Sequence, residues 1–238
     1  MEMVSASEKL SNVASPRTAP FDALNQFQSD QLPNEQSVWV AFRALQSDLI
    51  RFRHDKVIAC EGEAADHLFL VIDGVVRSCK TFKNGSRSVV AFYLPGDLFG
   101  WSDPDRTLSV EAASDATVLF LKRKTLLSLA SNESRIANFL LAAVSNELHR
   151  ARQHVLLISM QAKSRVASFL SDLSKRSKNQ NVVDLLMSHQ DIADYLGIKP
   201  ETLSRTITGF EHSGLVARNG KTRRLTLQTE RLLSQVKD

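Results

Sequence analysis

The feature that most constrains the fold is a change of hydrophobic period near residue 122. Between residues 56 and 122, short runs rich in Val, Phe and Leu alternate with segments containing Gly, Pro, Asn and Asp. Turns at intervals of roughly 8–12 residues are typical of an antiparallel β sandwich or barrel. The predicted strands are KVIAC, HLFLVID, GVVRSCKTF, RSVVAFYL, LSVEAAS and ATVLFLK.

Other local patterns complete the first half of the chain. Residues 1–36 are rich in Ser, Asn, Gln and Pro, which predicts a poorly ordered lead-in. The stretch SVWVAFRALQSDLI, residues 37–50, has apolar residues at helical spacing and predicts a helix. The sequence KNGSR, residues 83–87, predicts a hairpin turn in which Asn84 and Gly85 supply positive φ angles.

After residue 122 the spacing becomes helical. Ser131 or Asn132 is predicted to cap a helix that runs from Glu133 to about Ser159. At 1.5 Å per residue, this helix is about 39 Å long. Seven apolar residues on it recur at alternating spacings of four and three, which is the pattern of a coiled-coil seam. They are Ala137, Leu141, Val144, Leu148, Ala151, Val155 and Ile158.

The same helix has a second apolar edge, formed by Ile136, Phe139 and Leu140. That edge can pack on the helix's own domain, so the seam is left for another partner. Three unbroken heptads are best buried against the same helix of a second chain, and the seam therefore predicts a parallel homodimer.

The charge distribution points to a polyanionic partner of the last third of the chain. Residues 1–160 hold 17 Lys and Arg against 18 Asp and Glu, whereas residues 161–238 hold 13 against 8. A basic C-terminal third attached to a neutral body suggests that this third binds a polyanion. No apolar run is long enough to span a membrane, and the N-terminus lacks the pattern of a secretory signal. We therefore expect a cytoplasmic protein with reduced cysteines.

Residues 188–210 predict two short helices joined by a tight turn, preceded by an amphipathic helix over residues 162–176. Ser188 can cap the first short helix, and Gly197 can end it. Pro200 suits the first turn of the second. The residues predicted to face inward are Ile192, Ala193 and Leu196 on the first helix and Leu203, Ile207 and Phe210 on the second.

The second helix carries Glu201, Ser204 and Arg205 together on another face, near its N-terminal end. In a helix–turn–helix, that end of the second helix enters the major groove. Arg can donate two hydrogen bonds to guanine, Glu can accept from cytosine and Ser can bond to several bases. These three residues are therefore predicted to read base edges. The alternative is an ordinary salt bridge between Glu201 and Arg205 on a solvated helix.

Residues 213–227, SGLVARNGKTRRLTL, predict a β hairpin with its turn at Asn219-Gly220, followed by a short closing helix. Lys221, Arg223 and Arg224 flank the turn with no bidentate partner in the sequence pattern. A basic hairpin after a helix–turn–helix is a wing, whose cations suit phosphates. The predicted phosphate contacts are Gln190, Lys199, Thr202, Arg218, Lys221 and Arg223.

With these motifs in order, the chain from about residue 40 resembles the CRP/FNR superfamily of bacterial transcription regulators. The resemblance rests on LPGDLFG at 94–100, the long helix and HQDIADYLGIKPETLSR. The form Glu-Thr-x-Ser-Arg at residues 201–205 is similar to the FixK-like branch. One departure is Lys199, where the family usually places a capping Ser or Thr, so this helix start is expected to be softer.

The resemblance implies an α+β chain. A β-roll (jelly roll) like that of cyclic-nucleotide-binding domains over residues 37–130 would follow the lead-in. A dimerisation helix over 131–160 and a winged helix-turn-helix over 161–238 would complete it. It also implies binding to a TTGA-N6-TCAA palindrome as a homodimer and a contact with RNA polymerase, as an activator.

The residues expected for known ligands of this superfamily are largely missing. The cAMP-binding form has a Glu where this chain has Trp101, although Arg106-Thr107 resembles its later Arg-Ser pair. We expect no cyclic nucleotide, with Arg106 a surface cation on a loop. An iron–sulfur cluster needs about four thiolates, and only Cys60 and Cys79 exist, both predicted to be buried as small hydrophobic residues.

The haem-type pattern of Cys and His after the GD turn is replaced by Gly100, Trp101 and Ser102. The resemblance to FixK-type members implies action without a small-molecule signal. Two alternatives stay open: a ligand-gated regulator of the same fold, and a cupin-type enzyme with a nucleic-acid-binding tail. The sequence lacks an H-x-H pair typical of a cupin metal site and a Ser/His/Asp grouping, so we expect no enzyme.

Overall fold

The computed structural model describes residues 47–101, 106–177, 181–218 and 223–234. The chain divides into two compact units. The first contains the chain up to Cys79 together with Phe92–Glu147, and the second contains Lys80–Ala91 together with Leu148–Asp238. The predicted lead-in over residues 1–36 lies outside the described residues.

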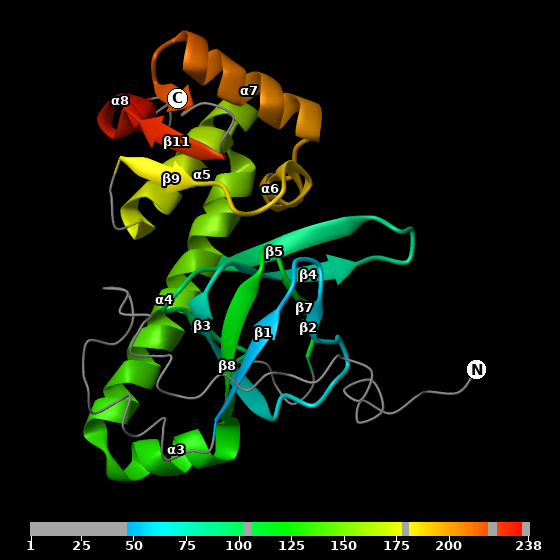
Figure 1. The fold of residues 1–238 in the computed structure, drawn as a ribbon, viewed down its shortest axis with the longest axis vertical. Helices are drawn as coiled ribbons and strands as arrows, with labels where there is room; N and C mark the ends of the chain where they lie inside the picture. The colour runs from blue at the N-terminus through cyan, green and yellow to red at the C-terminus, as the bar shows by residue number, and fades with distance from the viewer. Residues whose placement is uncertain (1–46, 102–105, 178–180, 219–222, 235–238) are drawn as a thin grey trace. The chain divides into compact units, whose positions relative to one another are not determined.

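The strands between residues 48 and 122 form two four-stranded sheets, in the orders β1-β8-β3-β6 and β2-β7-β4-β5 (Figure 1). Most of these strands belong to the first unit, whereas the end of β4 and the first five residues of β5 belong to the second. All six strands predicted from the sequence are present, which confirms the β-roll. The strands are β1 (Asp48–Phe52), β2 (Val57–Ala59), β3 (His67–Asp73), β4 (Val76–Thr81), β5 (Arg87–Tyr93), β6 (Leu98–Phe99), β7 (Ser109–Ala112) and β8 (Ala116–Lys122).

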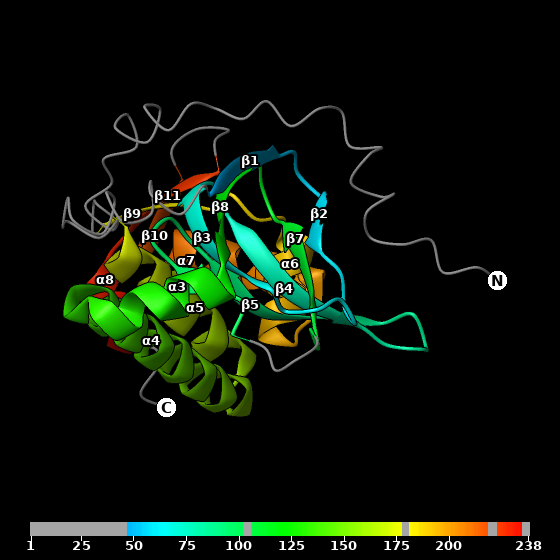
Figure 2. The same ribbon diagram turned by 90° about the horizontal axis from the view of Figure 1, so that it is seen from below.

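One hydrophobic core cluster of the first unit lies between the β1-β8-β3-β6 sheet and two helices, α3 (Arg123–Asn132) and the start of α4 (Ser134–Ser159). Figure 2 shows α3 followed directly by α4. Ile136 and Leu140 of α4 are buried and Phe139 is partly buried against the same cluster. This confirms that the second apolar edge of the long helix packs on its own domain.

Three local predictions need correction. Asp48–Ile50, predicted at the end of a helix, lie in β1, where Leu49 is buried and pairs with Leu119 of β8. Ser131 and Asn132 do not cap α4, because both belong to α3 and donate to the carbonyls of Leu127 and Ser128.

The third correction concerns the β4–β5 hairpin. Gly85 has a positive φ of 80°, but Asn84 does not share it. The side-chain oxygen of Asn84 instead accepts hydrogen bonds from the backbone N–H (3.0 Å) and the hydroxyl (2.7 Å) of Ser86. The turn therefore needs one left-handed residue, and the Asn side chain completes it.

In its described residues, the second unit contains four further helices and a three-stranded sheet of order β10-β11-β9. Strand β9 is not indicated by the sequence pattern, because it is only three residues long and follows a polar stretch. The elements are α5 (Ala162–Arg176), β9 (Val182–Asp184), α6 (His189–Leu196), α7 (Pro200–His212), β10 (Val216–Arg218), β11 (Arg224–Leu227) and α8 (Thr229–Leu233).

Three further features of the described residues bear on the expectations from sequence. No helix there is long and apolar enough to cross a membrane. No group of three or more His, Cys, Asp or Glu side chains in that part could hold a metal ion. Both cysteines are outside any disulfide: Cys79 is buried, as predicted, whereas Cys60 is only half-buried.

Candidate nucleic-acid interface

Helices α6 and α7 form the predicted helix–turn–helix. The Ser188 hydroxyl accepts from the backbone N–H of Asp191 at 3.0 Å, which caps α6. Gly197 adopts the left-handed conformation that ends α6, and α7 starts at Pro200. Lys199 stands at the N-cap of α7 without a side-chain hydrogen bond, as predicted. All six residues predicted to face inward are buried: Ile192, Ala193, Leu196, Leu203, Ile207 and Phe210.

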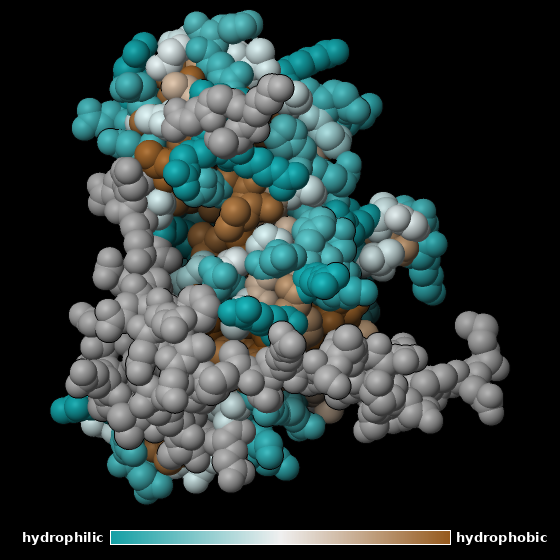
Figure 3. Space-filling model, in the orientation of Figure 1, coloured by the Kyte–Doolittle hydropathy of each residue, from teal (hydrophilic) through white to brown (hydrophobic). Residues whose placement is uncertain are grey.

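The opposite face of α7 is polar and exposed. Glu201, Ser204 and Arg205 are all exposed, and the view of Figure 3 shows largely hydrophilic side chains over α7. No side-chain hydrogen bond or ion pair joins Glu201 or Arg205 to any residue of the described ranges. The alternative of an i, i+4 salt bridge is therefore absent, and both charged groups are available to a ligand.

Side chains from two other helices hold α6 in place. Arg165 of α5 donates from Nη1 to the carbonyls of Leu196 (2.9 Å) and Gly197 (3.3 Å), so a cation satisfies the C-terminal end of α6. The ring of His154 in α4 stacks on Tyr195 at 4.3 Å, and its Nε2 lies 2.9 Å from the Tyr195 carbonyl oxygen. Burial raises the pKa of the Tyr195 hydroxyl to about 12, so it stays neutral.

The predicted phosphate contacts differ in how accessible they are. Gln190 and Lys199 are exposed, and Thr202 is half-buried. Arg218 pairs with Glu211 at 2.8 Å, whereas Arg223 is exposed. Lys221 lies outside the described residues, as does the predicted turn at residues 219–220.

Arg224 corrects the prediction that the wing cations lack bidentate partners. Its Nε and Nη2 donate to the two carboxylate oxygens of Asp184 at 2.8 and 2.9 Å. This pairing lowers the pKa of Asp184 and raises the pKa of Arg224. Arg224 therefore ties β11 to β9, where it reinforces the strand pairing of the sheet.

The pKa of His189, the first residue of α6, reflects the burial and the charges around it. Burial lowers the pKa of His189, and the positive charges of Arg218 and Arg223 lower it further. Burial and the two nearby cations therefore both favour the neutral imidazole. A surface that resists a further positive charge is suited to an anion.

A separate cavity of about 230 Å³ lies in the first unit. Its lining includes Ser78, Tyr93, Trp101, Arg106 and Glu147. Ser78 donates to the Tyr93 hydroxyl at 3.3 Å, and Tyr93 donates to Glu147 at 3.0 Å. These three polar groups of the cavity lining are therefore hydrogen-bonded to one another.

Arg106 corrects the expectation of a surface cation, since it is only 5% exposed. Its guanidinium donates to the carbonyl of His67 at 3.0 Å and lies 4.6 Å from the centre of the Phe69 ring. Burial lowers the pKa of Arg106 from its ordinary value. Sequence reasoning misses this because Asp-Pro-Asp-Arg is typical of an exposed loop, and nothing local indicates that an aromatic ring lies against the arginine.

Comparison with known proteins agrees with this geometry. The cyclic nucleotide-binding domain family matches residues 49–133, and the Crp-like helix-turn-helix domain family matches residues 164–236. The nitrogen fixation regulation protein FixK of Azorhizobium caulinodans is 40% identical over 173 residues, 70% of each chain. The transcriptional activatory protein AadR of Rhodopseudomonas palustris is 31% identical, over 70% of this chain and 72% of its own length.

Among solved structures, FixK2 from Bradyrhizobium japonicum is similar with a TM-score of 0.74 and 35% identity, covering 80% of this chain and 98% of that one. The two domain families, the FixK relatives and this fold agree with one another. The chain therefore belongs to the CRP/FNR superfamily of transcription regulators, in its FixK-like branch, with a helix-turn-helix DNA-binding domain in its C-terminal third.

Proposed function

We propose that this regulator is a cytoplasmic transcription activator that binds a TTGA-N6-TCAA palindrome as a homodimer and contacts RNA polymerase. One observation carries the proposal: the exposed face of α7 presents Glu201, Ser204 and Arg205 without side-chain partners among the described residues. The relative AadR is a transcriptional activatory protein, which supports activation. All the relatives named above are regulators, which supports a non-enzymatic role.

The roles on α7 follow from donor and acceptor chemistry. Arg205 donates two hydrogen bonds to the G of TTGA, and Glu201 accepts from the exocyclic amine of the paired C. Ser204 lies beside the first T·A pairs. The direct test is a binding titration of the full chain against the palindrome and a scrambled duplex at fixed salt. Equal affinity for both would overturn sequence-specific binding.

Dimerisation through α4 is the second part of the proposal. Six of the seven seam residues are exposed in the single chain, and Ala137 is half-buried. Among the larger side chains of the seam, Leu141 at 69% and Val155 at 65% are the most exposed. A row of exposed apolar side chains on one side of a helix is unfavourable in water, and a twin helix would bury it.

The wing should contribute affinity without specificity. If Arg223 binds one phosphate, Arg223→Ala is expected to lower the slope of log K against log salt by about 1, with equal weakening on all duplexes. Arg224→Ala is the matched control, because Arg224 is already paired with Asp184 and should change the slope much less. An unchanged slope in Arg223→Ala would exclude a phosphate role for that residue.

The regulator is proposed to act without a cofactor, metal or cyclic nucleotide. The cavity, at about 230 Å³, is smaller than the roughly 300–1,000 Å³ of ordinary ligand pockets. Ser78, Tyr93 and Glu147 are bonded to one another, so these three polar groups of the lining are already engaged, although the indole N–H of Trp101 has no hydrogen-bond partner among the described residues.

One observation favours a second candidate, a ligand-gated regulator: buried Arg106 lines the cavity and could hold an anion. Isothermal calorimetry with cAMP and with cGMP separates the two candidates. We expect no heat of binding from either nucleotide at concentrations up to about 1 mM, which corresponds to a binding free energy weaker than about −4 kcal/mol. Saturable binding that is abolished by Arg106→Ala would establish the second candidate instead.

A further inference from the structure

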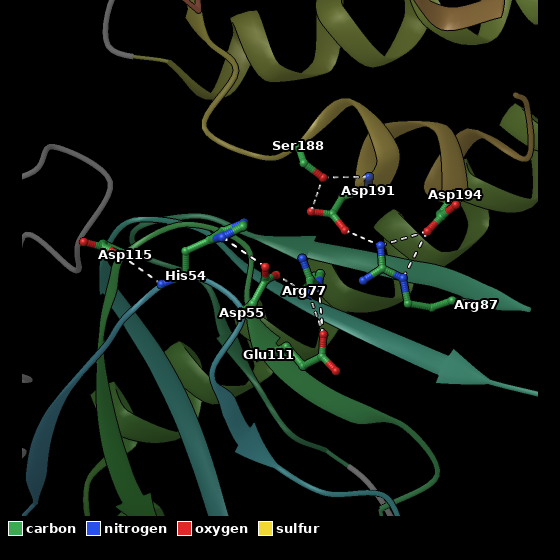
Figure 4. Close-up of polar contacts among 9 residues, drawn as sticks. All are labelled: His54, Asp55, Arg77, Arg87, Glu111, Asp115, Ser188, Asp191 and Asp194. Carbon is green, nitrogen blue, oxygen red and sulfur yellow. Dashed lines mark hydrogen bonds and ion pairs between the residues drawn. The ribbon is translucent and has the colours of Figure 1, made fainter. Parts of the chain in front are cut away.

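An arginine far from α6 in sequence contacts two carboxylates of that helix. Arg87 begins β5 and lies in the segment Lys80–Ala91, which belongs to the second unit. Its Nη2 donates to Asp191 at 2.6 Å, and its Nε and Nη2 donate to one oxygen of Asp194 at 3.0 and 2.9 Å (Figure 4). The side chain of Arg87 is 27% exposed and that of Asp191 is 1% exposed, so the pairing is largely shielded from water.

Both carboxylates are also bonded to the N-terminal half of α6. The second oxygen of Asp191 accepts from the Ser188 hydroxyl at 2.8 Å, within the same group of contacts that caps the helix. The second oxygen of Asp194 accepts from Nε2 of Gln190 at 2.6 Å. A continuous path of hydrogen bonds therefore leads from Arg87 through Asp194 to Gln190.

This path ends on a residue proposed to contact a DNA phosphate. The Gln190 amide nitrogen carries two N–H groups, and one of them is used on Asp194. Holding that amide fixes the direction of the other N–H, so the side chain gives up less freedom when a phosphate binds. Arg87 also supplies a positive charge beside two carboxylates that would otherwise repel a phosphate.

We propose that Arg87 is a positioning residue for DNA binding, which acts through Asp194 to orient Gln190 toward a backbone phosphate. This inference rests on the proposed DNA-binding function and on Gln190 as a phosphate contact. It concerns affinity and not base preference, because neither Arg87 nor Gln190 belongs to the polar face of α7.

The test is a double-mutant cycle on DNA affinity in the full chain. Arg87→Ala, Gln190→Ala and the double variant are titrated against the palindrome and against an unrelated duplex at one salt concentration. Arg87→Ala breaks the path of hydrogen bonds that orients Gln190 toward a charged phosphate. The variant should therefore bind both duplexes about tenfold more weakly. When Gln190 is already alanine, the additional weakening from Arg87→Ala should be less than about threefold, because the group it positions is gone.

Matched variants distinguish positioning from a general loss of stability. Arg51→Ala removes an exposed arginine of β1 and should leave DNA affinity unchanged. Arg87→Lys keeps the charge but lacks the planar fork that spans two carboxylates, so an intermediate weakening is expected. If Arg87→Ala does not fold, as judged by its thermal unfolding midpoint, the same cycle is run with Arg87→Lys.

Equal weakening with and without Gln190, or no weakening from Arg87→Ala, would overturn the positioning role. Failure of the proposed function looks different, because the wild-type chain would then not prefer the palindrome over the unrelated duplex. A wild-type chain that prefers the palindrome, together with an unaffected Arg87→Ala variant, therefore rejects only the inference about Arg87.

Discussion

Arg205→Ala is expected to weaken binding to the palindrome by about 1–3 kcal/mol at each half-site, or about 2–6 kcal/mol for a dimer on both. The guanidinium is exposed on α7, one helical turn after Glu201, and bonds to no residue in the described part of the chain. Its removal should therefore cost little folding free energy, and the weaker binding should come from the two missing hydrogen bonds to guanine.

The pattern of the weakening is more informative than its size. Titrations against the palindrome and its single-base changes at fixed salt should show relaxed preference at the G·C pair alone. Ser204→Gly removes the hydroxyl proposed to lie beside the first T·A pairs, so it should relax preference at those pairs. Arg51→Ala, with an exposed arginine removed from β1, is the control for non-specific charge. If Arg205→Ala instead lowers affinity equally for every sequence, Arg205 is a phosphate contact and the base assignment fails.

Much of the helix–turn–helix could be predicted from sequence because its signals are local. Ser188, Gly197 and Pro200 mark helix ends through their own side-chain or backbone preferences, and the structure places each where the pattern indicates. The burial of Leu203, Ile207 and Phe210 follows from a spacing that repeats once per helical turn. Such features need no knowledge of the rest of the chain.

The predictions fail where a residue's state depends on distant parts of the chain. Asp48–Ile50 continue a helical spacing, yet they pair with β8, and no local feature indicates that partner. Arg106 follows a loop-like stretch but is covered in the folded β domain. A strong helical pattern also hides a boundary, since Ser131 and Asn132 end α3 and do not begin α4.

The contact between Arg87 and α6 could not be predicted from the sequence either. Arg87 lies 104 and 107 positions from its two carboxylate partners, and a single sequence contains no signal that pairs them. Asp191 could be placed at the start of α6 from the preference of carboxylates for that end of a helix. That it also accepts from a hairpin arginine is visible only in the three-dimensional structure.

Leu148→Asp is expected to convert the proposed dimer to monomers and to weaken binding to the palindrome by about two orders of magnitude or more, because a monomer engages one half-site only. Leu148 is 49% exposed in the single chain and lies at the centre of the seam from Ala137 to Ile158. In a parallel pair of helices, the two introduced carboxylates would face each other away from water. An uncompensated buried charge costs several kcal/mol, more than the burial of one leucine side chain contributes.

Light scattering measures the mass, and Leu127→Asp on α3 is the matched control, since Leu127 is 45% exposed but lies off the seam. A Leu148→Asp protein that stays dimeric with normal DNA affinity would show that α4 does not form the dimer interface.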